Sequence, residues 1–448
     1  MTQDLCETTP VQVPRRAGAK PVGEVRARWA WTQRTVWTDR MLTALERGVK
    51  GGVWFSLIDK VYCLSNLGSA FAKVKANRGA AGCDHQTIAM VEADLEANLC
   101  DLSEQLRSGA YRPRKIRRVY IPKPGSRDLR PLGIPTVRDR IVQTALRNVI
   151  EPIFERDFAE HSYGFRPLRG CKDALRRVDS LLKVGYTHVV DADLKSYFDT
   201  IPHAPLMERI RHKIADGRVL DLIKAFLTQG VMDGLDIWTP TSGSPQGAVI
   251  SPLLSNAYLD PLDHKLAEQG LEMVRYADDF VILCRSEAEA QMALERVRAW
   301  TADAGLTLHP DKTRIVDANR EGFDFLGYHF ERGKRWPRDK SLMRFKDAIR
   351  AKTPRKHGHS LQVIIASVNR TTRGWFDYFK HTSYTTVFRS LDGQIRRRLR
   401  RILLKRNRKH DRNGRGYAHY RWPNAYFAEH GLYSMEAAHV RLRQSVAR

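Results

Sequence analysis

Two spacings of apolar residues alternate along this chain and predict its elements. From Trp37 onward, apolar side chains three and four positions apart are typical of amphipathic helices. A loop over 77–84 interrupts this pattern, and the helical spacing then returns. Further helices are predicted over 88–106, 139–155, 171–182 and 287–304.

Short apolar runs rich in Val, Ile and Phe predict strands between these helices. From residue 189 onward the predicted elements follow the order strand, helix, strand, strand, helix, strand, which is expected of a split βαβ unit. The strands are predicted within 116–135, 189–193, 274–283 (a hairpin), 306–313 and 323–330.

Two adjacent carboxylates, Asp278 and Asp279, stand at the turn of the 274–283 hairpin. Like charges at this separation repel, and each raises the proton affinity of the other unless a cation lies between them. A divalent ion with oxygen ligands, Mg²⁺ above all, relieves that repulsion. The pair alone does not separate a metal site from a solvated turn, and we assign about even odds to the two interpretations.

A third carboxylate strengthens the metal interpretation. Asp193 ends the apolar run 189–193, so a sheet that places the two strands side by side would bring Asp193 to Asp278. Three carboxylates there could hold two metal ions, the arrangement that stabilises the attacking and leaving oxygens in phosphoryl transfer. Asp191 and Asp199 are better explained as strand-end and helix-capping residues.

Two loop segments offer candidate ligand contacts. Lys123 and Arg130 flank a Gly-containing turn and could place two cations over a triphosphate, or could be solvated loop charges. Residues 242–253 contain two glycines and two prolines, which indicates a tight loop that permits close backbone approach to a ligand. From that loop Gln246 could bond a base or sugar, or could cap the turn.

The composition favours a polyanionic partner. The 448 residues include 76 Lys and Arg against 50 Asp and Glu, a net charge of +26, which indicates nucleic acid first. No apolar run approaches the roughly 20 residues of a spanning helix, and no secretory core is seen, so we expect a cytoplasmic protein with no membrane partner. Six scattered cysteines without zinc spacing disfavour a zinc module and a disulfide framework.

Beyond residue 340 the chain becomes rich in aromatic and basic residues. Over 395–409 the apolar residues bury one face of a helix, which leaves the cations on the other faces. Because acidic partners are absent, these cations favour a phosphate-binding surface over a merely solvated face. The aromatic residues of 413–439 could stack on bases or dock as a small core. The candidate nucleic-acid-binding residues are Arg396, Arg397, Arg400, Arg401, Lys405 and Arg408.

Taken in order, these segments resemble a bacterial group II intron reverse transcriptase, also called an intron maturase. The resemblance runs from about residue 70 to 440 without large gaps. It rests on the loop over 77–84, Ile121-Pro122-Lys123-Pro124, the segments 130–135 and 161–167, the acidic strand, Ser244-Pro245-Gln246-Gly247, Tyr276-Ala277-Asp278-Asp279, Pro310-Asp311-Lys312-Thr313, Phe325-Leu326-Gly327 and the segment 373–379.

The resemblance implies an α/β right-hand polymerase: reverse transcriptase fingers with a split βαβ palm, an α-helical maturase thumb and a basic C-terminal tail. The implied divisions are an N-terminal extension, partly disordered or RNA-associated, over 1–60, fingers and palm over 61–335, the thumb over 336–410, and over 411–448 a basic and aromatic tail that is a candidate for DNA or RNA binding.

The resemblance also implies a metal site. Asp193 and Asp278 would be the principal ligands of two Mg²⁺ ions, for which Mn²⁺ can substitute. Asp279 would assist them, and the carbonyl of Leu194 would complete a coordination shell.

Around that site, the resemblance implies a nucleotide pocket. Phe198 would lie beneath the sugar, where a bulky ring clashes with a 2′-hydroxyl and so favours deoxynucleotides. Lys123 and Arg130 would hold the triphosphate, with Gln246 also contacting the nucleotide. Lys312 would protonate the departing pyrophosphate.

The implied function is that of an RNA-directed DNA polymerase that copies intron RNA into cDNA and binds this RNA to assist splicing and retrohoming. Expected partners are group II intron RNA in a ribonucleoprotein, target DNA, a primer–template and dNTPs, with the protein nucleoid-associated when on DNA. Many relatives carry a DNA-cutting module with paired Cys and His that is not seen here, so cleavage of the second target strand is not expected. Ala248 stands where the family often has Gly, which is a mild change.

Two other functions stay open. The first is an RNA-binding splicing maturase without polymerase activity, against which the intact acids and cations speak. The second is a reverse transcriptase of a phage-defence, diversity-generating or CRISPR-associated system. The segment at Gly374-Trp375 favours the intron class over these systems.

Overall fold

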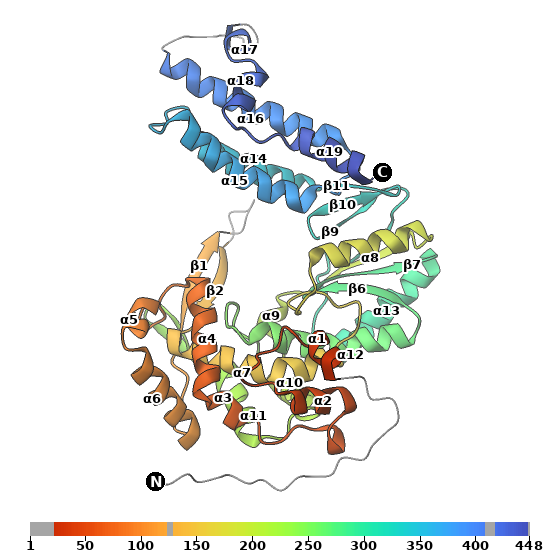
Figure 1. The fold of residues 1–448 in the computed structure, drawn as a ribbon. Coiled ribbons are helices and arrows are strands. Elements are labelled where there is room, and N and C mark those ends of the chain that lie inside the picture. The colour runs from red at the N-terminus through yellow and green to blue at the C-terminus, as the bar shows by residue number, and fades with distance from the viewer. Residues whose placement is uncertain (1–21, 123–128, 408–416, 447–448) are drawn as a thin grey trace.

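The computed structural model describes residues 22–122, 129–407 and 417–446. Figure 1 shows the N-terminal helices and three small sheets in a lower and middle α/β body, with the C-terminal helices stacked together at the upper end. The mixed α/β architecture with a helical C-terminal region agrees with the class expected from the sequence.

A four-stranded antiparallel sheet carries the acidic segments, in the order β6-β7-β3-β8. Helix α12 (Ser251–Glu268) immediately precedes β6, and helix α13 (Glu287–Asp303) lies between β7 and β8. With β3 first, these elements follow the predicted order strand, helix, strand, strand, helix, strand. The split βαβ prediction is therefore confirmed for this sheet. The strands are β3 (His188–Asp193), β6 (Glu272–Tyr276), β7 (Asp279–Cys284) and β8 (Arg314–Asp317).

Both faces of this sheet are covered, which explains why its strands are continuous apolar runs. Val190 and Ile282 point into the main core, whereas Val189 and Val281 belong to a second cluster packed with α8 (Cys171–Lys183). Successive residues of a strand face opposite sides, so this division follows directly from the period of two. Asp193, Asp278 and Asp279 stand at the ends of these strands and are only half-buried, outside both apolar clusters.

Two predicted strands differ in the structure. The run 306–313 forms only an isolated bridge, from Leu308 to Leu194, and β8 begins afterwards. The run 323–330 is not one strand but two, β9 (Phe323–Phe325) and β10 (Tyr328–Glu331), because Leu326 and Gly327 both adopt positive φ and turn the chain. With β11 (Lys334–Pro337) these strands make a separate three-stranded sheet.

The third sheet has the order β2-β1-β4-β5. Its first two strands confirm the prediction over 116–135, but the β4–β5 hairpin was not predicted, since strands of three residues carry too little periodicity to detect. The strands are β1 (Ile116–Pro122), β2 (Leu129–Ile134), β4 (Val231–Asp233) and β5 (Asp236–Trp238).

The part of the predicted N-terminal extension that the structure describes belongs to the main core. Trp37 is fully buried, and its indole Nε1 donates a 3.0 Å hydrogen bond to the carbonyl of Asn148 on α7 (Val137–Glu155). Trp54 pairs through its backbone with Ile214. A boundary at residue 60 therefore does not separate a domain. The helices before it are α1 (Val22–Arg28), α2 (Asp39–Arg47), η1 (Lys50–Gly52) and α3 (Ile58–Tyr62), the last of which extends across it.

Helices form the rest of the lower body. The predicted helix over 88–106 is divided at Asp94, whose backbone leaves the helical region. The remaining helices of this body are α4 (Leu64–Asn77), α5 (Ile88–Ala93), α6 (Leu95–Ser108), α9 (Tyr197–Thr200), α10 (His203–Arg211) and α11 (Gly217–Leu227).

The C-terminal helices have a core of their own. Trp422 and Phe427 are buried in it, so these aromatic residues of the tail dock as a small core instead of facing bases. Tyr378 joins this region to the sheet below, because its hydroxyl donates to the carbonyl of Leu326 at 2.7 Å. The helices are α14 (Asp339–Lys352), α15 (Leu361–Phe379), α16 (Thr385–Arg406), α17 (Tyr417–Arg421), α18 (Asn424–Glu429) and α19 (Met435–Val446).

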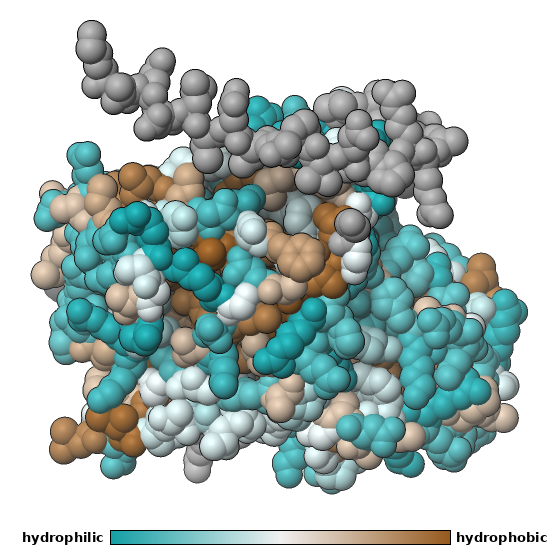
Figure 2. Space-filling view, turned by 90° about the horizontal axis from the view of Figure 1, so that it is seen from below, coloured by the Kyte–Doolittle hydropathy of each residue, from teal (hydrophilic) through white to brown (hydrophobic). Residues whose placement is uncertain are grey.

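The surface is mainly hydrophilic on the face seen from below, with apolar side chains appearing between the polar ones (Figure 2). Within the described ranges, no helix combines the length and the apolar character needed to cross a bilayer.

Candidate active site

The three predicted acids meet at one edge of the central sheet. Asp193, the last residue of β3, lies directly opposite Asp279, the first residue of β7, in the antiparallel ladder. Asp278 occupies the turn immediately before β7. Side chains directly opposite one another in such a ladder share a face and have Cβ atoms only about 5 Å apart. The structure thus brings together three carboxylates that are 86 residues apart at most, from Asp193 to Asp279.

A buried ion pair holds the turn that carries Asp278. The Arg275 guanidinium pairs with Asp263 of α12, and both side chains are buried. Its Nη1 also donates 2.9 Å hydrogen bonds to Asn256 Oδ1 and to the carbonyl of Ala277. Ala277 has a φ of +60°, a conformation that non-glycine residues rarely adopt without such support. The arginine therefore fixes the backbone from which the acids project.

The segment 161–167 braces the same turn from its other side. The Tyr163 N–H donates 2.9 Å to the carbonyl of Arg275, and the Arg275 N–H donates 3.0 Å to the carbonyl of His161. Gly164 lies so close to Ala277 that a Cβ on it would collide with the Ala277 backbone nitrogen. The glycine in this motif is thus required for packing against the acidic turn.

Burial and mutual repulsion raise the proton affinity of the clustered acids. Burial, followed by the charges of Asp191, Asp278 and Asp193, raises the pKa of Asp279 to about 7. The pKa of Asp278 is also raised, mainly by burial and then by the charge of Asp193. Such a site favours the binding of positive charge, which a divalent ion held by the carboxylates would supply.

One cation already contacts the cluster. Lys312 Nζ donates a 2.6 Å hydrogen bond to Asp193 Oδ2, so this carboxylate is directed toward the lysine. Within the described ranges, no three His, Cys, Asp or Glu side chains are grouped closely enough to hold a metal ion. The donor chemistry fits Mg²⁺, because all three candidate side chains are carboxylates, but their ligation stays a prediction. Leu194, also predicted as a ligand, is buried and pairs with Leu308.

A cavity of about 450 Å³ lies between the β2-β1-β4-β5 sheet and the 242–246 loop. Phe198 and Gln246, both predicted to contact a nucleotide, line it together. Gln246 Nε2 donates to Asp199 Oδ2 at 3.4 Å. The backbone carbonyl of Gln246 accepts a 2.7 Å hydrogen bond from the Gly133 N–H. The loop is therefore docked on β2 with the Gln246 side chain at the cavity.

The predicted triphosphate contacts are placed in part. Arg130 is exposed on β2, close enough that its charge partly opposes the burial that raises the pKa of Asp278 and of Asp199. Lys123 lies outside the described residues. The binding of a triphosphate by these two cations stays a prediction.

Two residues of the cavity wall were missed from the sequence. Arg118 of β1 and Trp238 of β5 line it, with the guanidinium 5.1 Å from the ring centroid. Trp238 comes from the short β4–β5 hairpin, so no periodic signal indicated it. Asp199, taken as a capping residue, also lines the cavity, and burial raises its pKa.

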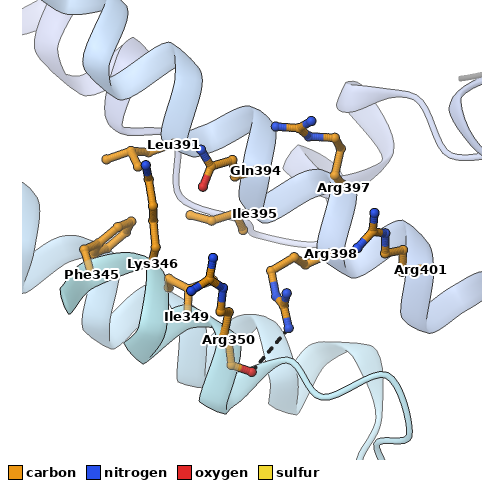
Figure 3. A pocket seen from close by; sticks show the side chains of 10 residues that line it. All are labelled: Phe345, Lys346, Ile349, Arg350, Leu391, Gln394, Ile395, Arg397, Arg398 and Arg401. Atoms are coloured by element: carbon orange, nitrogen blue, oxygen red, sulfur yellow. Dashed lines mark hydrogen bonds between the residues drawn. The ribbon is translucent and has the colours of Figure 1, made fainter. Parts of the chain in front are cut away.

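The predicted cationic helix is α16. Figure 3 shows cations of α16 and α14 around an apolar floor, with Arg398 Nη2 donating to the carbonyl of Arg350 at 3.4 Å. The cationic lining of this groove is Lys346, Arg350, Arg397, Arg398 and Arg401, and it includes no carboxylate. Of the predicted residues, Arg397, Arg401 and Lys405 are exposed, Arg396 is half-buried and Arg408 lies outside the described residues.

Arg400 does not belong to the exposed cationic face. It is 5% exposed, and its guanidinium donates 2.8 Å to the carbonyl of Trp422 and 2.9 Å to Asn424 Oδ1. The guanidinium carbon also lies 5.3 Å from the centroid of the Phe427 ring. The prediction for Arg400 is therefore wrong as to exposure, since helical spacing turns this residue toward the docked tail, where it anchors α18.

Two family descriptions match the chain. Residues 121–330 match "Reverse transcriptase (RNA-dependent DNA polymerase)", and residues 342–422 match "Group II intron, maturase-specific domain". The first range holds the acidic cluster and the cavity residues Phe198 and Gln246, and the second begins in α14 and ends at Trp422.

Individual proteins are also similar to this chain. Protein YkfC of Escherichia coli (strain K12) is 38% identical over 290 residues, which cover 56% of this chain and 76% of YkfC. The group II intron-encoded protein LtrA of Lactococcus lactis subsp. cremoris is 40% identical over 168 residues, which cover 38% of this chain but only 28% of LtrA. Among solved structures, the "Partial Cas6-RT-Cas1--Cas2 complex" matches over 55% of this chain and 41% of that chain, with 26% identity and a TM-score of 0.37.

Proposed function

Because this chain belongs to the family of group II intron reverse transcriptases and maturases, we propose that it copies intron RNA into cDNA and binds that RNA to assist splicing and retrohoming. The observation that carries the proposal is the pairing of Asp193 with Asp279 at the end of the split βαβ sheet. A cavity of about 450 Å³ lined by Phe198 and Gln246 supports it, because its volume suits a nucleotide. In polymerase terms, that sheet is the palm, β1 and β2 belong to the fingers, and α14–α16 form the thumb.

The proposed chemistry places the acids at the reacting phosphate. Asp193 and Asp278, assisted by Asp279 and by the carbonyl of Leu194, are the groups that would hold divalent metal ions between the primer 3′-hydroxyl and the α-phosphate of the dNTP. Polymerases of this family generally depend on divalent metal, which supplies charge stabilisation at the attacking and leaving oxygens when it is bound. Arg130, with Lys123, binds the triphosphate, and Lys312 donates a proton to the departing pyrophosphate.

Phe198 is proposed to select deoxynucleotides. Its half-buried ring lines the cavity with Gln246, so a 2′-hydroxyl placed above the ring would meet it. We expect Phe198→Val to increase incorporation of ribonucleotides relative to deoxynucleotides, measured as the ratio of kcat/KM values. An unchanged ratio would remove Phe198 from this role.

Intron RNA is proposed to bind the exposed cations of α16. The groove formed with α14 joins five cations to an apolar floor, and the maturase-specific match covers both helices. Target DNA and the primer–template are further partners of the proposed reaction. Such binding releases counterions from phosphates, so RNA affinity should fall steeply with salt.

The decisive experiment removes the acids of the turn. The double variant Asp278→Ala, Asp279→Ala should lose primer extension on an RNA template while keeping its affinity for RNA. A matched double variant of exposed carboxylates, Glu268→Ala with Glu287→Ala, should keep both properties. Retained extension in the first variant would refute the assignment.

The alternatives make different predictions in the same assays. A splicing maturase without polymerase activity would bind intron RNA yet fail to extend any primer. A reverse transcriptase of a phage-defence, diversity-generating or CRISPR-associated system would extend primers without promoting intron splicing. The match of residues 342–422 to the maturase-specific domain supports the intron assignment over the second alternative. The intact Asp193, Asp278 and Asp279 speak against the first.

A further inference from the structure

The loop behind the acidic turn presents two apolar side chains to solvent. Phe165 is 45% exposed and Leu168 is 81% exposed. Their φ angles are +59° and +58°, in the left-handed region that costs non-glycine residues of order 1 kcal/mol or more. Two strained, exposed apolar residues in one short loop are not explained by the packing of the core.

The exposure is imposed by a rigid frame. Arg166, between the two apolar residues, is 6% exposed and donates to both oxygens of Glu155, at 2.8 Å from Nη2 to the nearer one. It also donates to the carbonyls of Ala159 and Ser162. Because every one of these contacts is internal, the arginine fixes the backbone and turns its neighbours outward.

Phe165 and Leu168 form one wall of a cavity of about 420 Å³. This volume suits one nucleotide and is too small for a duplex. The opposite wall carries aromatic, cationic and amide groups, a combination that can stack on a base and bond its edge or its phosphate. The cavity lining includes Trp31, Gln33, Lys73, Arg147, Asn148 and Phe165.

The polar groups of the cavity leave it positive. Lys73 Nζ donates 2.7 Å to Asn148 Oδ1, an amide oxygen, so no carboxylate accepts that hydrogen bond. Arg147 pairs with Glu151 at 2.6 Å, which neutralises that pair. The surplus positive charge at Lys73 favours a phosphate next to the stacked base.

Phe165 also connects the cavity with the acidic turn, since its ring centroid lies 6.4 Å from that of Tyr276. We propose that this cavity binds an unpaired nucleotide of the RNA template, stacked against Phe165, close to the point of synthesis. The primer is paired at its 3′ end, so the unpaired strand near the acids is the template. This inference rests on the proposed function for the identity of the strand.

The test measures the affinity gained from a template overhang. Fluorescence anisotropy, without dNTP, compares a blunt RNA–DNA duplex with one that carries a ten-nucleotide RNA overhang. The unmodified protein should bind the overhang duplex more tightly. Phe165→Ala should weaken overhang binding by about ten-fold, as expected for loss of one stacking platform, and leave blunt binding unchanged. Phe165→Tyr should retain the gain.

Two further variants keep the result interpretable. Leu168→Ala should reduce the overhang gain in the same direction and serves if Phe165→Ala fails to fold. Val184→Ala, an exposed apolar residue at the end of α8, should change nothing. An unaltered overhang gain, or an equal loss on blunt and overhang duplexes, would overturn the proposal. Since binding is read without synthesis, a protein that fails to extend primers would refute the proposed function separately.

Discussion

Lys312 donates a hydrogen bond to Asp193, a candidate catalytic residue, with Nζ 2.6 Å from Oδ2. The lysine side chain is 59% exposed and the aspartate 32% exposed, so the pair stands open to solvent. An exposed ion pair contributes little to stability. The pair matters for metal binding, because the lysine Nζ is hydrogen-bonded to the same Asp193 oxygen that would bind a divalent ion.

Replacing Lys312 should separate two roles of its charge. Lys312→Met frees Asp193, so we expect half-maximal primer extension at a several-fold lower Mg²⁺ concentration, together with a lower kcat. Lys312→Arg keeps the charge but removes a dissociable proton, since arginine stays protonated in proteins. It should restore the Mg²⁺ dependence and not the rate. Full recovery of kcat in Lys312→Arg would contradict proton donation to pyrophosphate.

Gly247 tests how tightly the cavity loop is docked. Its φ is +106°, and a Cβ there would collide with the Gly133 carbonyl and lie 2.9 Å from Leu132 Cδ1. Gly247→Ala should therefore displace the loop, raise the KM for dNTP and lower the free energy of unfolding by about 1–3 kcal/mol. Gly234→Ala is the matched control, because Gly234 also has positive φ (+62°) but no atom within 4 Å of the added methyl. Equal effects would show that backbone strain alone, and not the docking, is responsible.

The sequence predicted the elements whose signal is local. The acids at Asp193 and Asp278 could be placed because each follows a strongly apolar strand, and the strand order then determined their meeting. It could not predict that Arg400 is buried, since the partner that covers it, the tail around Trp422, is distant in sequence and has no periodic relation to α16. The cavity beside Phe165 could not be predicted from the sequence either, because its walls come from four segments that are separate along the chain.

Breaking the buried Arg275–Asp263 pair is expected to lower both stability and activity, although neither residue belongs to the acidic cluster. Asp263→Ala leaves the guanidinium buried without its carboxylate, which should destabilise the protein by about 3–5 kcal/mol in chemical denaturation. Primer extension should fall too, because Arg275 holds the Ala277 carbonyl of the acidic turn. The double variant Arg275→Met, Asp263→Leu should recover most of the stability but not the activity. Recovery of both would mean that the turn does not depend on Arg275.

Asp377 predicts a pH dependence of stability. Hydrogen bonds from Lys172 and Lys380 lower its pKa to about 2, below the value of about 3.9 in an unfolded chain. A lowered pKa stabilises the folded state above about pH 4, and this contribution is lost as the pH falls toward 2. The side chain is 60% exposed, so solvent screening limits it to less than about 1 kcal/mol. Asp377→Asn should thus lower the melting temperature slightly at pH 6, and the difference should vanish near pH 2. Asp303→Asn, at the exposed end of α13, is the control.

Arg401 and Arg400 are neighbours in sequence with opposite expected phenotypes. Arg401 is exposed in the groove of α14 and α16, so Arg401→Ala should weaken RNA binding and reduce the slope of log affinity against log salt by about one. Arg400→Ala should keep that slope, because the residue faces inward, but it leaves the Trp422 carbonyl without its donor and should cost about 1–3 kcal/mol of stability. Filter binding across a salt series and thermal unfolding of both variants measure the two effects. A reduced slope in Arg400→Ala, or an unchanged slope in Arg401→Ala, would show that RNA does not track the exposed face of α16.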